Sequence, residues 1–375
     1  MAETKINWTD AVWNPILGCD RVSPGCDGCY AITQARIRAG NPNPKISEAF
    51  AGLTTRTESG IDWTGRVNLL PERLEQPLHW RKPRKIFVNS LADLFHDAVP
   101  DEYIARVFAV MAATPHHTYQ VLTKRHGRMR SLLSRGTLGT AGFPDMVEDA
   151  MAEFTHASLD QWPLPGVWLG VSAEDQPTAA MRVHALLATP AAVRWVSTEP
   201  LLGPVDLRNL QVRGNVVIDA LAGDVKTSDG EIYAACPGSV SWVVCGGESG
   251  AKARPMHPDW ARSLRDQCQE ASASYWFKQW GMWGPAPWRV ERGPGESDAG
   301  YIRRAEAVCA THAYATWADR YGHHPHEAGH KPWSGERGIL PEGQAPIRRW
   351  GKDAAGRELD GRTWDEFPLS AVTAS

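Results

Sequence analysis

The chain repeats one pattern, in which a short apolar run ends in polar or glycine residues and is followed by a stretch of helical periodicity. Continuous apolar runs of this kind are typical of strands buried on both faces of a parallel sheet. An earlier run, Ala11–Cys19, predicts a first strand that leads into a cysteine-rich loop. The other predicted strands lie at Lys85–Ser90, Thr118–Lys124, Val167–Asp175, Val193–Pro200, Ser241–Gly250 and Tyr275–Gly281.

Amphipathic helices are predicted between these strands. One begins at Pro100, where proline and the acidic residues after it favour a helix start, and apolar residues then recur at helical spacing. A second covers 259–271, and Cys268 falls on its apolar stripe. Cys245 lies inside a predicted strand. We therefore expect Cys268 and Cys245 to be core residues and not ligands.

The alternation of strands and helices predicts an α/β fold, either a partial or complete parallel (β/α) barrel or an open doubly wound sheet. The barrel is favoured because the predicted strands end in polar or ionisable side chains, and in a barrel these ends converge on one face where active sites are built. The side chains concerned are Ser90, Asp93, Lys124, Ser172, Glu174, Glu199, Glu248 and Lys278.

Two regions depart from this pattern. The segment at 213–239 predicts an inserted hairpin or loop, and residues 291–375 predict an irregular, loop-rich extension that packs on a barrel-like domain formed by residues 1–290. The extension contains the histidine-rich tract Gly322–His330. Because its spacing is irregular and prolines intervene, we interpret this tract as a surface loop and not as a metal site.

Composition narrows the class of protein. The formal net charge is −3, which argues against a strongly basic, non-specific nucleic-acid binder, although short basic patches occur at Arg81–Lys85 and Lys124–Arg130. No apolar run reaches the roughly 18 residues of a membrane span, and the first residues do not resemble a secretory signal. Seven cysteines are few and odd in number, which does not suit a disulfide framework. We expect a cytoplasmic protein with reduced thiols and no membrane association.

Three of those thiols, Cys19, Cys26 and Cys29, form the pattern C-x6-C-x2-C and predict a metal centre. Structural zinc needs a fourth ligand, and the spacing does not select one among candidates such as His96, His116 and His117. A [4Fe–4S] cluster held by three thiolates instead keeps one iron open for a substrate or cofactor. Both alternatives stand, and the cluster is favoured because the loop follows a predicted first strand.

The loop resembles that of radical S-adenosylmethionine enzymes, in which C-x3-C-x2-C follows the first strand of a β/α barrel, but its first gap has six residues. Several stretches, including "WNPILGCDRVSPGCDGCYA", "RKIFVNSLADLFHDAVPDE" and "VVCGGESGAKARPMHPDW", resemble a phage-associated three-Cys-motif family of uncharacterised, radical-SAM-like proteins. The resemblance implies a barrel of the radical-SAM type, a [4Fe–4S] cluster on the three cysteines, S-adenosylmethionine as cofactor and an electron donor. It also implies a separate three-Cys-motif partner protein.

The resemblance implies roles for the residues at the strand ends. Ser90 or Asp93 is expected to contact the amino end of the cofactor, and Ser172 and Glu174 its ribose or carboxylate. The remaining three, Lys124, Glu199 and Glu248, are expected to line the substrate pocket. The basic patches favour a nucleotide or nucleic acid as substrate, for modification or repair. The alternative is a zinc-stabilised, non-enzymatic β/α protein that binds nucleic acid or a protein partner.

Overall fold

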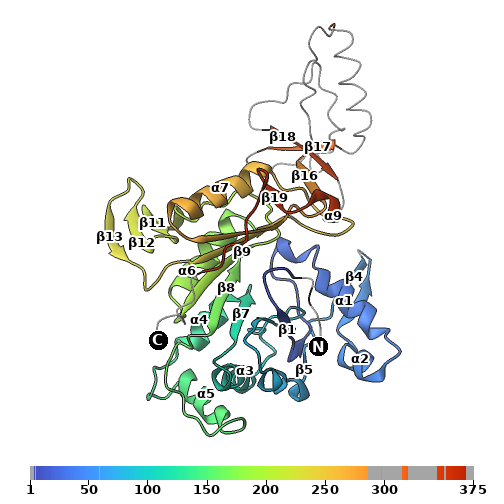
Figure 1. Cartoon of the computed structure of the whole chain (residues 1–375), viewed down its shortest axis with the longest axis vertical. Helices are drawn as coiled ribbons and strands as arrows, with labels where there is room; N and C mark the ends of the chain where they lie inside the picture. Colours follow the sequence, from blue (N-terminus) through green and yellow to red (C-terminus); the bar gives the residue numbers. More distant parts are fainter. Residues whose placement is uncertain are drawn as a thin grey trace.

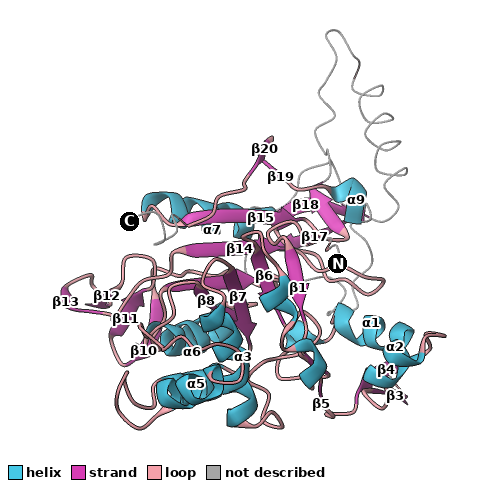
Figure 2. Cartoon of the chain, turned by 60° about the horizontal axis from the view of Figure 1, so that its bottom comes forward, coloured by secondary structure: helices cyan, strands magenta, loops and turns pink. Residues whose placement is uncertain are grey.

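Seven parallel strands form the main sheet and lie side by side in the order in which the chain visits them. In the computed structural model, which describes residues 4, 6–58, 60–285, 297, 315–319, 344–349 and 352–368, the sheet curls into a half-barrel (Figures 1 and 2). A doubly wound sheet has a point where the strand order reverses, and this sheet has none. The doubly wound alternative is therefore wrong. The strands are β1 (Ala11–Trp13), β6 (Lys85–Val88), β7 (Thr118–Thr123), β8 (Val167–Ser172), β9 (Val193–Thr198), β14 (Trp242–Gly246) and β15 (Ser274–Gln279).

The six later strand predictions are confirmed, each overlapping one strand of the sheet, but the first is shorter than expected. β1 ends at Trp13, and Pro15, which has no amide hydrogen to donate, interrupts the run. The chain then forms β2 (Ile16–Leu17), which pairs antiparallel with β5 (Asn68–Leu69) outside the main sheet. The chain therefore turns away from the sheet before it reaches the cysteines.

Helices cover the convex face of the sheet, as Figure 2 shows. The predicted helices are confirmed as α3 (Asp101–Ala113) and α7 (Pro258–Glu270). Cys245 and Cys268 are fully buried in the core between helices and sheet, so both predictions of a core position are confirmed. The other helices packed here are α4 (His126–Leu133), α5 (Phe143–Met151) and α6 (Gln176–Leu187).

The concave face is filled by tryptophans, which form the tryptophan cluster together with Phe87, Val193 and Val244. The rings of Trp195 and Trp242 lie 5.1 Å apart, and Trp8 packs edge-on against both. Gly170 makes room for one of them, because a methyl group there would lie 2.4 Å from the indole of Trp195. The half-barrel is therefore packed solid below its carboxyl-terminal end. The tryptophans are Trp8, Trp168, Trp195, Trp242 and Trp276.

Beside the half-barrel, the cysteine loop (residues 18–29) leads into a small lobe with its own apolar cluster, which includes Ile32, Phe50 and Leu53. A 3-10 turn, η1 (Pro24–Cys26), lies within the loop. Cys19 and Cys29 pack against the cluster of the lobe. Its elements are α1 (Tyr30–Ala39), α2 (Pro44–Ala49), β3 (Thr54–Thr57) and β4 (Gly60–Trp63), and the 3-10 turns η2 (Pro71–Arg73) and η3 (Gln76–His79) follow before β6.

The region between β9 and β14 is a four-stranded antiparallel sheet, which projects from the half-barrel in Figure 1. It begins at Leu210, slightly before the insertion predicted at 213–239, and it is more regular than a hairpin or loop. Its strands are β10 (Leu210–Arg213), β11 (Val216–Asp219), β12 (Asp224–Thr227) and β13 (Ile232–Ala235).

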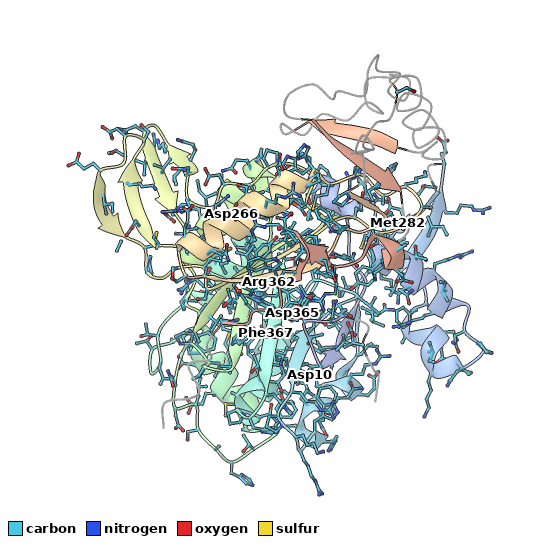
Figure 3. All side chains as sticks on the ribbon, turned by 45° about the horizontal axis from the view of Figure 1, so that its top comes forward. Asp10, Asp266, Met282, Arg362, Asp365 and Phe367 are labelled. Carbon is cyan, nitrogen blue, oxygen red and sulfur yellow. The ribbon has the colours of Figure 1, made fainter. Side chains whose placement is uncertain are left out.

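The described parts of the extension contain regular structure. A three-stranded sheet joins β16 (Trp283–Pro285), β18 (Gln344–Arg349) and β17 (Ala315–Asp319). After α9 (Lys352–Ala355) and the pair β19 (Glu358–Leu359) and β20 (Arg362–Thr363), the chain runs along β15, and Figure 3 shows Asp365 and Phe367 there. The histidine-rich tract lies outside the described residues. Within the described ranges, no helix combines the length and the apolarity needed to cross a membrane.

Candidate functional site

Ionisable side chains converge where the parallel strands end, as expected from the topology. Lys124 follows β7 and donates to Glu174, which follows β8, at 2.6 Å. Lys278 of β15 bonds both carboxylate oxygens of Glu199, which follows β9, at 2.6 and 2.7 Å. This second pair spans β14 at Gly246, where a methyl group would lie 3.5 Å from both side chains, an ordinary contact distance. We call the group formed by Lys124, Glu174, Glu199, Lys278 and Glu248 the mouth of the half-barrel.

Glu174 is almost completely buried in the mouth, with 2% of its side chain exposed. Besides Lys124, it accepts a hydrogen bond from Arg182 at 2.9 Å and one from the Ser23 hydroxyl at 3.0 Å. Burial opposes ionisation of this carboxyl, but the charges of Lys124 and Arg182 outweigh it and lower its pKa to about 2. Glu174 is therefore a fixed anion in contact with the cysteine loop.

Glu248, which follows β14, is the second buried carboxylate that touches the loop. Its two oxygens accept from the guanidinium of Arg254 at 2.6 and 2.9 Å and from the Arg254 amide at 2.8 Å. The same guanidinium donates to the carbonyl oxygen of Pro24 at 2.9 Å and lies 3.6 Å from Asp27. Arg254 thus ties the β14 end of the mouth to the cysteine loop.

Two glycines allow the loop to lie directly on these carboxylates. A methyl group at Gly25 would lie 2.3 Å from Glu174 Oε1, and one at Gly28 would lie 2.4 Å from Glu248 Oε1. Both distances are far below any ordinary contact, so a side chain at either position would force the loop and the mouth apart. The glycines are needed for close approach of the backbone to Glu174 and Glu248.

The three thiols belong to the loop that rests on the mouth, and Cys19 and Cys29 each have a cation nearby. Cys26 is buried, and Cys19 and Cys29 are half-buried. Burial raises the pKa of the Cys19 thiol to about 12, Asp93 adds to this, and Arg125 opposes it. Burial also raises the pKa of Cys29, against the charge of Lys124. No group of three His, Cys, Asp or Glu side chains in the described ranges is arranged to hold a metal ion.

Asp93 and Ser90 follow β6, and their contacts are internal. The Asp93 carboxylate accepts from the Thr123 hydroxyl at 2.7 Å and from the amides of Phe95 and Lys124, each at 3.0 Å. Ser90 donates to the side-chain oxygen of Asn14 at 3.2 Å. These contacts fix the turn after β6 to the ends of β1 and β7, and they leave little bonding capacity in Asp93 for a ligand.

Asn89 directly follows β6 and has the most unusual conformation and surroundings of the polar residues there. It is 3% exposed, it has a left-handed backbone with φ of 58°, and neither polar atom of its side chain has a hydrogen-bond partner among the described residues. A buried, unpaired amide in a strained backbone is typical of functional sites. The sequence carries no signal for the backbone angle that distinguishes it.

The histidines considered as a fourth zinc ligand lie in different places. His96 is buried, and its Nε2 lies 3.5 Å from the carboxylate of Asp20, the residue after Cys19. His116 and His117 instead bond the carbonyl oxygens of Trp80 and Pro77, before β6 begins. Only His96 of the three is therefore beside the cysteine loop.

The structure brings most of the predicted residues together. Glu174 and Glu248 touch the cysteine loop directly, and Lys124 and Glu199 complete the mouth. Ser172 is buried at the end of β8, where its carbonyl oxygen accepts from Arg182 at 2.9 Å. The sequence did not predict roles for Arg182, Arg254 and Asn89. Arg182 lies in the middle of α6, where no motif marks it.

A parallel half-barrel with a three-thiol loop seated on a charged mouth defines a class of partial β/α-barrel proteins with a candidate cofactor site at the carboxyl ends of the strands. The chain belongs to the family described as Protein of unknown function (DUF5131), whose family model matches residues 3–368. Neither the curated proteins nor the solved structures contain a match to the chain.

Proposed function

We propose that this protein is a radical S-adenosylmethionine-type enzyme with a [4Fe–4S] cluster on Cys19, Cys26 and Cys29. The observation that carries the proposal is the seating of the cysteine loop, which rests through Gly25 and Gly28 on the mouth of a parallel half-barrel. In β/α folds, this carboxyl end of the sheet is where reactive groups are assembled. Resemblance to the radical-SAM-like three-Cys-motif proteins adds support.

The chemistry of the donor set fits such a cluster. Three thiolates on a sulfide cluster form an anionic group, and Arg125 and Lys124 place positive charge beside Cys19 and Cys29. The thiols do not form an assembled metal site in the described ranges, so the proposal requires Cys19, Cys26 and Cys29 to converge when the cluster is built. Glycines in the loop give its backbone the freedom for that adjustment.

When bound, a cluster with three protein ligands supplies an open coordination position for the cofactor and an electron for its reductive cleavage. The chain's own residues bind and orient the cofactor. Ser172 and Glu174 are proposed to contact the ribose or carboxylate of the cofactor, and Ser90 its amino end. Asp93, whose oxygens are engaged by β7, is better suited to positioning the turn after β6.

We assign the substrate site to Lys124, Glu199 and Glu248, because all three follow strands of the main sheet at its carboxyl-terminal end. All three side chains are in ion pairs. A polar substrate that bonds the carboxylate of Glu199 or Glu248 would therefore displace Lys278 or Arg254 from it. A nucleotide or a nucleic acid, for modification or repair, is the proposed substrate class. The reaction also requires an electron donor, and a three-Cys-motif partner protein is the proposed companion.

The test is anaerobic reconstitution with iron and sulfide, followed by metal analysis and a visible spectrum. We expect about four irons per chain and cleavage of S-adenosylmethionine on reduction. Cys26→Ala is expected to abolish cluster binding. Its matched control, Cys268→Ala, changes a fully buried core thiol and is expected to cost on the order of 1–2 kcal/mol of stability while leaving the iron content unchanged. A colourless, iron-free protein after reconstitution would refute the proposal.

One observation favours the alternative, a zinc-stabilised protein that binds nucleic acid or a partner. His96 lies beside the cysteine loop, and its Nε2, 3.5 Å from Asp20, accepts or donates no hydrogen bond among the described residues, so it could complete a site of three thiolates and one imidazole. One tightly held zinc per chain in protein purified without oxygen, lost in His96→Ala, is the outcome that selects this alternative. Retention of iron in His96→Ala selects the cluster.

A further inference from the structure

A groove on the outside of the half-barrel carries chemistry that the mouth does not use. It lies between α4 and α6 and encloses about 470 Å³. Of its eight lining residues none is acidic, and they include one arginine, two histidines and two serines. They are His126, Gly127, Arg130, Ser131, Ser134, Met181, His184 and Ala185. The α4 side of the groove coincides with the basic patch at Lys124–Arg130.

Arg130 is the main charge of the groove. Its side chain is exposed, and it forms no ion pair within the described part of the chain. This contrasts with Arg125 and Arg128 of the same patch, which bond Asp20 and Asp101. The charge of Arg130 reaches His184 across the groove, where it adds to burial in lowering the pKa of that imidazole. A free guanidinium facing an imidazole is suited to an anion.

The start of α4 adds donors to the same groove. The helix begins at His126, and the side chain of its N-cap residue, Arg125, makes no capping hydrogen bond. The amides of His126 and Gly127 form no hydrogen bond with any described residue, so they are available at the positive end of the helix dipole. The hydroxyls of Ser131 and Ser134 lie further along the groove.

One wall of the groove is apolar. Met181 of α6 is 56% exposed, and Ala185 follows it by four residues on the same face of the helix. An exposed methionine beside an anion-binding surface can cover the sugar or base of a bound nucleotide. Polar anion-binding groups beside an exposed apolar side chain suit a ligand that carries both a phosphate and an organic part, and not an inorganic ion alone.

We propose that the α4–α6 groove binds a phosphate group of a nucleotide or of a single nucleic-acid strand. Arg130, His184 and the first turn of α4 hold the phosphate, and Met181 covers the adjoining sugar or base. At the His126 end of the groove, Nδ1 of His126 lies 3.4 Å from the carbonyl oxygen of Lys124, so a strand held there would extend toward the mouth. The groove lies outside the mouth, and its occupancy can be measured without a cluster.

The experiment measures binding of the full-length, metal-free protein to a fluorescein-labelled single-stranded oligonucleotide of about twelve residues by anisotropy. Unlabelled adenosine monophosphate and inorganic phosphate are the competitors. Competition by the mononucleotide at concentrations similar to those of the strand assigns the site to a nucleotide, whereas competition only by an unlabelled strand assigns it to nucleic acid. Either result supports a phosphate site, and absence of binding to any of the probes overturns it.

Arg130→Ala is the diagnostic variant, and Arg213→Ala is its control. Arg213 is also exposed and without an ion pair among the described residues, but it lies on β10, so both variants change the net charge equally. We expect Arg130→Ala to weaken binding about tenfold and to reduce the slope of log K against log salt by roughly 0.7. Equal weakening by both variants would show non-specific attraction and overturn the proposal.

Discussion

The carboxylate of Glu174 should contribute strongly to stability because it is a buried anion between two cations. We choose Glu174→Gln as the perturbation, since the amide keeps the shape of the side chain and removes only its charge. Lys124 and Arg182 would then lack their shared anionic partner at 2.6 and 2.9 Å. The loop contact through Ser23 can persist, because the glutamine oxygen still accepts.

The magnitude follows from the pKa of Glu174, which is lowered from its ordinary value of 4.5 to about 2. The difference corresponds to about 3 kcal/mol of folding free energy when the group is ionised in both states. Because the folded pKa lies below the unfolded one, this contribution is complete above about pH 5. It is then lost progressively as the pH falls from about 4.5 toward 2.

The assay is urea unfolding of the metal-free protein, followed by tryptophan fluorescence, at about pH 7 and about pH 3. Glu174→Gln is expected to lose about 3 kcal/mol at neutral pH and clearly less at acidic pH, relative to the unchanged chain at the same pH. The control is Glu153→Gln, whose 2.7 Å partner Arg106 lies at the surface, with an expected loss below about 1 kcal/mol. Similar losses for both variants, or a loss in Glu174→Gln that does not change with pH, would refute this reasoning.

Three further predictions concern close contacts. Gly28→Ala places a methyl group 2.4 Å from Glu248 Oε1 and should displace the cysteine loop, so iron content after reconstitution should fall severalfold while the tryptophan fluorescence of the core stays unchanged. Arg254→Lys keeps the charge but loses the simultaneous bonds to Glu248 and Pro24; we expect reduced iron content and faster proteolysis of the loop, and unchanged values would contradict the tie. Gly170→Ala inserts a methyl group 2.4 Å from the Trp195 indole and should destabilise the core by about 1–3 kcal/mol in urea unfolding.

The main sheet was predictable because its strands are apolar on both faces. Each of the six later apolar runs corresponds to a strand, and β8 and β9, in which all six residues are buried, are the clearest cases. The four-stranded sheet at 210–235 was not predictable, since β10 is mostly exposed and β12 is only half-buried, so neither stands out as an apolar run. Such strands depend on pairing with neighbours more than on their own composition.

The convergence of ionisable residues was also predictable, because parallel strands end on one side. Which residues pair was not, since the pairs depend on strand register and on helix packing. The bridge from Lys278 to Glu199 crosses an intervening strand, and Arg182 reaches Glu174 from α6. The strain at Asn89 and the contacts of Arg254 arise only in three dimensions, so no spacing in the sequence announces them.

The segment that runs along β15 has a consequence for how the chain is completed during synthesis. The amide of Phe277 donates to the carbonyl oxygen of Trp364, and the Tyr275 amide donates to Glu366, 91 positions later in the chain. Until that segment emerges from the ribosome, the backbone of β15 is an open template for pairing with another chain. A chain that ended after Gln279 would lack this cover, so it would present β15 as an exposed edge strand that a chaperone would have to shield.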